Sequence, residues 1–229
     1  MRKIIFFLVL AISTSFVYGQ TDTTKTKWVK YSPDFKFEDG LYLNFSQVKQ
    51  NDPLPVARVI TSLDSNSPDF FEGLLRDKSV YYYDDFGVRQ EIKTDKIWGY
   101  SQNGALFILF GQGFNRVTVI GSICHFLATV TNYNRAYPYD PFYNNYYNYY
   151  YYGMMPQNYA TSEMRQYLID FKTGKVLDYD EKSVETLLMS DPELHDEYAQ
   201  LRTRKRDQLK FMYIRKFNER NPLMLPQKH

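Results

Sequence analysis

Residues 97–110, IWGYSQNGALFILF, place Asn103 and Gly104 between two apolar runs. An Asn-Gly pair favours the tight turn that joins two antiparallel strands, because both residues tolerate the positive φ angles of that turn. The segment therefore predicts a β-hairpin. Similar strand and turn signals lie on both sides of this segment in the chain, so it indicates a fold built on antiparallel strands.

Four further segments carry strand signals. Residues 56–63 alternate and are β-branched, and residues 78–100 predict a hairpin that turns near Gly87. Residues 115–133 are long enough for two strands with a break near Gly121, and residues 164–180 predict a hairpin that turns near Gly174. In chain order these segments predict an antiparallel meander of about seven to nine strands, either a twisted sheet or a partly closed barrel.

The last part of the chain changes to helical periodicity. Residues 182–190 predict a short helix, and Asp191-Pro192 is a strong start signal for a second one. Asn221-Pro222 ends this long amphipathic helix. Its apolar side is formed by residues at three- and four-residue spacing: Leu194, Tyr198, Leu201, Leu209, Met212, Tyr213 and Phe217. The predicted fold class is α+β, with a β domain over 35–180, helices packed on its sheet over 181–221, and a tail over 222–229.

Two short motifs carry a resemblance to a known group. The sequence resembles uncharacterised secreted Bacteroidota proteins that begin with Asp-Gly-x-Tyr-x-x-Phe and Asn-x-Pro and continue with a Trp-Gly-Tyr strand. The matching residues are Asp39, Gly40, Tyr42, Phe45, Asn51, Pro53, Trp98, Gly99 and Tyr100. The resemblance implies secretion and a β-rich fold. It implies no catalytic residue, because these motifs consist of turn and core residues.

The first nineteen residues have the features of a signal peptide. Arg2 and Lys3 precede an apolar run over 4–12, and Gly19 ends a plausible cleavage site before Gln20. The alternative is a retained anchor, for which the apolar run is short. Cleavage would leave a flexible tether over 20–34, no transmembrane segment in the mature chain, and a periplasmic or extracellular protein.

Charge and cysteine content narrow the function further. The chain has 28 Lys and Arg against 26 Asp and Glu, and removal of Arg2 and Lys3 leaves 26 against 26. A neutral mature chain lacks the global basic field of a nucleic-acid-binding protein. Cys124 is the single cysteine in the sequence, so no intramolecular disulfide can form and a packed core must stabilise the fold.

The sequence predicts no catalytic residue, no metal site and no cofactor. Cys124 and His125 are neighbours, and neighbours on a strand point to opposite faces, so they cannot form a dyad. The other histidines, His195 and His229, lie in separate segments of the chain. Residues 111–116, GQGFNR, lack the third glycine of a phosphate-binding loop and predict a bulged turn instead.

One cluster of carboxylates leaves a catalytic alternative open. Asp178, Asp180 and Glu181 lie where the last predicted strand meets the first helix. Paired carboxylates perform acid–base hydrolysis in many glycosidases, although helix capping explains the same residues. The alternative function is therefore a hydrolase that acts on envelope polymers.

A tyrosine- and asparagine-rich insertion over 137–160 is the first candidate binding surface. It is predicted to be a surface loop, or alternatively an aromatic docking surface for a glycan or a protein. The residues proposed to contact the ligand are Tyr143, Tyr146, Tyr147, Tyr149, Tyr150 and Tyr151.

A basic segment of the long helix is the second candidate surface. Its cations either complement the helix dipole or contact an anionic envelope partner. The residues concerned are Arg202, Arg204, Lys205 and Arg206. The predicted function is that of a secreted, non-catalytic domain that binds an unknown envelope protein or glycan, or that supports an envelope assembly.

Overall fold

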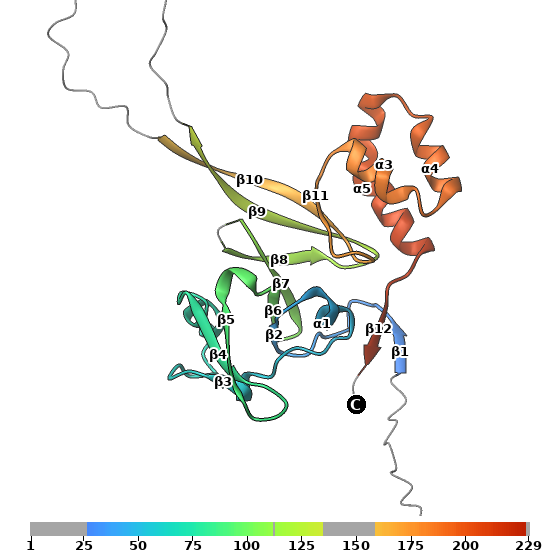
Figure 1. The fold of residues 1–229 in the computed structure, drawn as a ribbon. Helices are drawn as coiled ribbons and strands as arrows, with labels where there is room; N and C mark the ends of the chain where they lie inside the picture. Colours follow the sequence, from blue (N-terminus) through green and yellow to red (C-terminus); the bar gives the residue numbers. More distant parts are fainter. Residues whose placement is uncertain (1–26, 112, 135–158, 228–229) are drawn as a thin grey trace, which may run out of the picture.

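A computed structural model describes residues 27–111, 113–134 and 159–227 (Figure 1). Its largest element is an open seven-stranded antiparallel sheet with the order β11-β10-β9-β8-β7-β6-β2. The strands are β2 (Gly40–Tyr42), β6 (Gly99–Gln102), β7 (Ala105–Phe110), β8 (Gly113–Val119), β9 (Ile123–Asn134), β10 (Tyr159–Asp170) and β11 (Val176–Asp178). The α+β class and the sheet are confirmed, whereas the alternative of a partly closed barrel is wrong because β11 and β2 do not pair.

The predicted central hairpin is confirmed as β6 and β7. Asn103 and Gly104 both have positive φ angles, of 54° and 76°, at its turn. The Asp39 carboxylate accepts hydrogen bonds from the backbone N–H groups of both turn residues at 3.0 Å. Asp39 therefore fixes the turn from a distant part of the chain.

Asn51, from the second motif of the resemblance, also has a structural role. Its side-chain Oδ1 accepts hydrogen bonds from the Glu38 N–H at 2.9 Å and from the Tyr42 hydroxyl at 3.0 Å. Asn51 is buried and has a φ of 46°, a conformation that asparagine tolerates better than most residues. Asp39, Tyr42 and Asn51 thus hold the entry to the sheet, as expected for turn and core residues.

The segment between β2 and β6 forms a separate three-stranded sheet rather than part of one meander. Its strands are β3 (Val59–Ile60), β4 (Ser79–Tyr83) and β5 (Arg89–Lys93). The short helix α2 (Phe70–Leu74) and the inward side of β4 share a core cluster with Leu41 and Tyr100 of the large sheet. The remaining short elements here are α1 (Phe45–Lys49) and the 3-10 turns η1 (Val56–Arg58) and η2 (Thr94–Lys96).

Two strands from opposite ends of the described chain pair with each other. β1 (Lys27–Lys30) and β12 (Met224–Gln227) form a two-stranded antiparallel sheet. The sequence predicts a tether over 20–34 and a tail over 222–229, and both predictions are wrong where β1 and β12 form strands. Leu225 of β12 is fully buried in the core on one face of the large sheet.

The C-terminal part contains α3 (Glu181–Leu188), α4 (Pro192–Ala199) and α5 (Thr203–Arg220). The prediction of one helix from Pro192 to Asn221 is wrong, because Arg202 is extended, with φ −63° and ψ 146°. A continuous helix over 192–220 would be roughly 44 Å long and would carry its second half away from its first. The break instead brings the Tyr198 and Tyr213 rings to a centroid distance of 4.8 Å.

The buried side of α5 differs in part from the predicted apolar side. Tyr213 and Phe217 are buried as predicted, but Ile214 is fully buried and Met212 is 39% exposed. Leu201 and Leu209 are partly buried against the same cluster of helix and sheet residues. The helices therefore pack on the sheet through a side that is rotated from the predicted one.

A side chain of α5 hydrogen-bonds directly to the sheet backbone. The Asn218 amide donates to the carbonyl of Ile123 and accepts from its N–H, both at 2.8 Å. A Cβ on Gly121 would lie 2.5 Å from this amide, so glycine is needed there for the close approach of α5.

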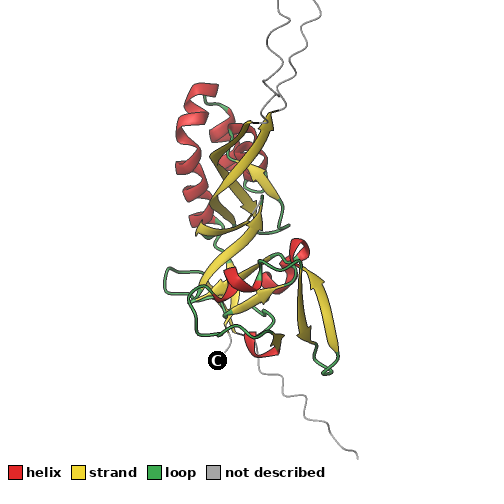
Figure 2. Cartoon of the chain, turned by 90° about the vertical axis from the view of Figure 1, so that its left-hand side faces the viewer, coloured by secondary structure: helices red, strands yellow, loops and turns green. Residues whose placement is uncertain are grey.

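Helices α3–α5 lie at one end of the molecule and the three-stranded sheet lies at the other (Figures 1 and 2).

Strands β9 and β10 pair along all twelve residues of each and extend beyond their neighbours in the sheet (Figure 1). β10 begins at Tyr159, so the last two residues of the insertion predicted over 137–160 belong to a strand. The six tyrosines proposed to contact a ligand lie outside the described residues. Among the helices of the described ranges, none is long and apolar enough to cross a membrane.

Candidate binding cleft

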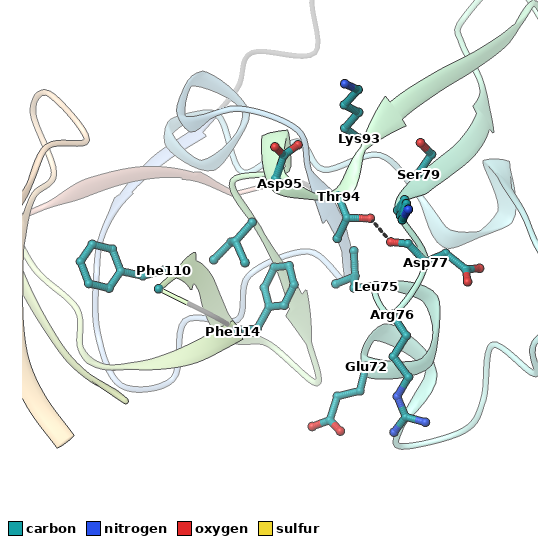
Figure 3. A pocket seen from close by; sticks show the side chains of 14 residues that line it. Glu72, Leu75, Arg76, Asp77, Ser79, Lys93, Thr94, Asp95, Phe110 and Phe114 are labelled. Carbon is teal, nitrogen blue, oxygen red and sulfur yellow. Dashed lines mark hydrogen bonds between the residues drawn. The ribbon is translucent and has the colours of Figure 1, made fainter. Parts of the chain in front are cut away.

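An open cleft of about 1080 Å³ lies where the three-stranded sheet meets the β7–β8 hairpin (Figure 3). One side of it comes from the large sheet, and the other comes from the end of α2 and the adjoining ends of β4 and β5. The residues that line it are Glu72, Leu75, Arg76, Asp77, Lys78, Ser79, Lys93, Thr94, Asp95, Leu109, Phe110, Gly111, Gly113 and Phe114.

The wall from the large sheet is apolar and rigidly supported. Leu109 and Phe114 pair across β7 and β8 on the face that lines the cleft. The Phe110 ring points to the opposite face of the sheet, where it packs against Tyr167 at a centroid distance of 4.4 Å (Figure 3). The Phe114 ring lies 5.3 Å from Tyr100. Aromatic rings at these separations attract one another, so the wall is held in place before any ligand arrives.

A stack of three rings stands behind Phe114. Tyr100 stacks on Phe71 at 4.5 Å and on Phe107 at 4.6 Å, both nearly parallel. Burial in this stack, and secondarily the charge of Glu72, raises the pKa of Tyr100 to about 12. Tyr100 is therefore neutral at physiological pH, and its role is to support the apolar wall.

The opposite wall is charged and has equal numbers of both signs. It contains the cations Arg76, Lys78 and Lys93 and the carboxylates Glu72, Asp77 and Asp95. Thr94 holds this wall together, because its N–H donates to the Lys78 carbonyl at 3.0 Å and its hydroxyl donates to the Asp77 carbonyl at 2.5 Å (Figure 3).

Gly111 and Gly113, at the end of the β7–β8 hairpin, line one part of the cleft. Gly111 has a φ of 66°, which lets the chain turn directly after Phe110. The Asn115 side-chain amide donates to the carbonyls of Phe110 and Gly113 at 3.0 and 2.9 Å. Gly111 thus lies between the end of β7 and the start of β8, in agreement with the turn predicted in residues 111–116.

The predicted carboxylate cluster is divided between a strand and a helix start. Asp178 is exposed at the end of β11, and Glu181 is in the first turn of α3. The Asp180 carboxylate caps α3 by accepting a hydrogen bond from the Ser183 N–H at 2.7 Å. Asp178 and Asp180 line an open hollow of about 570 Å³. Capping explains Asp180, and the hydrolase alternative stays a prediction.

The predicted basic surface is also divided. Arg202, Arg204 and Lys205 are exposed at the start of α5. Arg206 is partly buried, and its guanidinium donates to the Glu185 carboxylate at 2.6 Å. Arg206 therefore joins α5 to α3, and three of the four residues stay available for an anionic partner.

Cys124 and His125 lie on opposite faces of β9, as predicted. Cys124 is part of the core on one face, and burial raises the pKa of its thiol to about 12. On the other face, the His125 ring nitrogens lie 3.3 Å from the Thr118 hydroxyl and 2.9 Å from the Gln166 amide oxygen. In the part of the chain that the structure describes, no cluster of His, Cys, Asp and Glu could hold a metal ion.

The described residues therefore define an α+β protein with an open antiparallel sheet, helices packed at one end and a cleft at the other. Residues 40–221 match the model of a family of unknown function, DUF6563. The match covers most of the chain, so the protein belongs to this family. Neither the curated proteins nor the solved structures contain a significant match to it.

Proposed function

We propose that the protein is exported and works by binding a peptide segment of an envelope partner in this cleft, without catalysis. The observation that carries the proposal is the contrast between the two walls of the cleft. One wall is apolar and preformed, and the other offers three cations and three carboxylates. Ligand sites typically combine such apolar surface with a few convergent polar groups.

The balance of charges favours a peptide over other ligands. A polyanion would meet three carboxylates, and a polycation would meet three ammonium or guanidinium groups. A peptide carries apolar side chains and charges of both signs, so it can satisfy both walls at once. The Phe114 ring, which faces the cleft, has no hydroxyl or indole N–H to donate to a sugar, which favours a peptide over a glycan.

The first prediction concerns export. When the chain is expressed in a bacterium with residues 1–19 included, we expect the mature protein to begin at Gln20. The basic and apolar regions before Gln20 match a cleavable signal peptide. N-terminal sequencing or intact mass of the protein from the periplasm or the medium measures this. Recovery of the form that starts at Met1 from these fractions would refute the prediction.

The second prediction concerns the cleft. Peptides selected from a displayed random library against the wild-type protein should bind about tenfold more weakly to the double variant Arg76→Glu/Lys93→Glu. Both side chains are exposed, so the fold should be preserved, while the charge pattern of the polar wall is changed. Affinity is measured by fluorescence anisotropy with the labelled peptides.

The control carries the same change of charge at a distance from the cleft. The variant Arg204→Glu/Lys205→Glu alters two exposed cations at the start of α5. The selected peptides should bind this control as they bind the wild type. Equal affinity for both double variants would show that the selected peptides bind elsewhere.

A further inference from the structure

A second cavity, of about 680 Å³, lies between the C-terminal helices and the β1–β12 pair. Its lining comes from segments far apart in the chain: β1, the end of α1, the turn after β10, α3, the end of α5 and β12. No residue is shared with the cleft described above. Its volume is within the range of about 300–1,000 Å³ that is usual for small-molecule sites.

Three large apolar side chains at this cavity are open to solvent. Trp28 is 56% exposed, Met189 is 62% exposed and Met224 is 46% exposed. Single exposed apolar residues are common on protein surfaces, but their convergence on one concave site indicates a binding surface. The buried Phe217 and the partly buried Leu187 continue this apolar lining inward.

Three lysines line the same cavity. Lys49 donates a hydrogen bond from its Nζ to the Lys172 carbonyl at 3.3 Å, which holds the end of α1 against the turn that carries Lys172 and Lys175. All three lysines are exposed. The cavity therefore combines an apolar interior with a group of cations.

One carboxylate, that of Asp170, lies among the lining residues, and it has a role within the turn. Its oxygens accept hydrogen bonds from the Lys172 N–H at 3.0 Å and from the Thr173 hydroxyl at 2.6 Å. Asp170 thus fixes the turn that presents the lysines. The lining has an excess of two positive charges, so the complementary ligand carries a negative group.

We propose that this cavity binds an anionic amphiphile with a single acyl chain, a fatty acid, with its carboxylate at Lys49, Lys172 and Lys175. The acyl chain lies along the apolar lining, between Trp28, Met189 and Met224. Charge complementarity defines the head of the ligand, and the apolar concave lining defines its tail. A polar anion of the same charge would leave the apolar lining in water, and an uncharged chain would leave the lysines unpaired.

The test is a titration of the full-length protein with decanoate, dodecanoate and tetradecanoate below their micellar concentrations, followed by calorimetry and by tryptophan emission. We expect the affinity to rise roughly fourfold for each added methylene, the usual effect of burying one such group. Emission should shift to the blue because Trp28, one of two tryptophans in the chain, loses contact with water.

Two variants separate the head from the tail. Lys172→Gln/Lys175→Gln should weaken the binding of dodecanoate about fivefold and leave the binding of uncharged dodecanol unchanged. The matched control, Arg204→Gln/Lys205→Gln, removes two exposed cations elsewhere and should leave the binding of both ligands unchanged.

Three results would overturn the proposal. The first is an affinity that does not depend on the length of the acyl chain. The second is equal affinity of the Lys172→Gln/Lys175→Gln variant and the Arg204→Gln/Lys205→Gln variant for dodecanoate. The third is binding to anionic phospholipid vesicles without binding to monomeric fatty acid. The last result would identify a membrane surface as the partner instead. The Arg76→Glu/Lys93→Glu variant should bind fatty acid normally, so failure of this proposal is distinguishable from failure of the peptide cleft.

Discussion

Replacement of Gly99 by Ala is expected to lower the free energy of unfolding by about 3 kcal/mol or more. A Cβ at this position would lie 2.0 Å from the Phe107 carbonyl oxygen and 3.2 Å from the Ile108 Cα. Both contacts are with the backbone of the neighbouring strand, so no side-chain rotation can relieve them. Gly99 also pairs with Tyr42 of β2, so a shift of β6 would disturb both of its neighbours.

The control for this variant is Gly113→Ala at the start of β8. A Cβ on Gly113 meets no atom within 4 Å, so the same chemical change should have little effect there. Urea unfolding followed by circular dichroism measures both variants against the wild type. If the two variants unfold at the same urea concentration, β6 and β7 do not approach each other this closely at Gly99.

Replacement of Ile214 by Asp should be the most damaging change in the C-terminal helices. Ile214 is fully buried among residues of α3, α4 and the large sheet. A carboxylate there would lose its hydration without gaining a partner, which is expected to cost about 4 kcal/mol or more. Thermal and urea unfolding would measure the loss.

The neighbouring variant Met212→Asp tests the orientation of α5. Met212 belongs to the apolar side predicted from the sequence, but its side chain is 39% exposed in the structure. Its replacement should change stability by about 1 kcal/mol or less, as is usual for surface positions. A larger effect for Met212→Asp than for Ile214→Asp would mean that the predicted side of the helix, and not the observed one, packs on the sheet.

The sequence predicts the local hairpins of this fold well, because their turns are encoded in residues next to each other. Asn103-Gly104 forms the β6–β7 turn, and Gly174, with a φ of 80°, lies in the turn between β10 and β11. Each of these turns needs a positive φ angle, which few residues tolerate. The start of α4 at Asp191-Pro192 is local in the same sense, since Asp191 caps the helix and Pro192 is its first residue.

Features that depend on distant contacts could not be predicted in this way. No glycine or proline marks the break at Arg202, and the contact that the break permits, between the Tyr198 and Tyr213 rings, joins two different helices. The sequence also contains no local signal that β3, β4 and β5 form a sheet separate from the large one, because their hairpin signals match those of any meander. Strand pairing over a long sequence separation is specified by the completed core and not by adjacent residues.

The candidate binding cleft shows the same limit of local patterns. Its apolar wall comes from β7 and β8, whereas its charged wall comes from α2, the loop between α2 and β4, the end of β5 and η2. Leu109 and Phe110 belong to an apolar run that reads as ordinary strand core, and Arg76 and Lys93 read as ordinary surface residues. Their juxtaposition depends on how the two sheets pack. The carboxylates of Asp178, Asp180 and Glu181 form a recognisable pattern because they are close together in the sequence, and in the structure Asp180 is a helix cap.

The β1–β12 pair has a consequence for the order in which the chain folds. Lys27 lies opposite Gln227 in this pair, so the loop that it closes contains nearly the whole described chain. Closing so long a loop is entropically costly, and pairings of this kind form slowly. Among the strands of the described residues, β12 is also the last to be synthesised. The hairpins of the large sheet need only local contacts and can therefore form first, and β1 stays unpaired until residues 224–227 reach it.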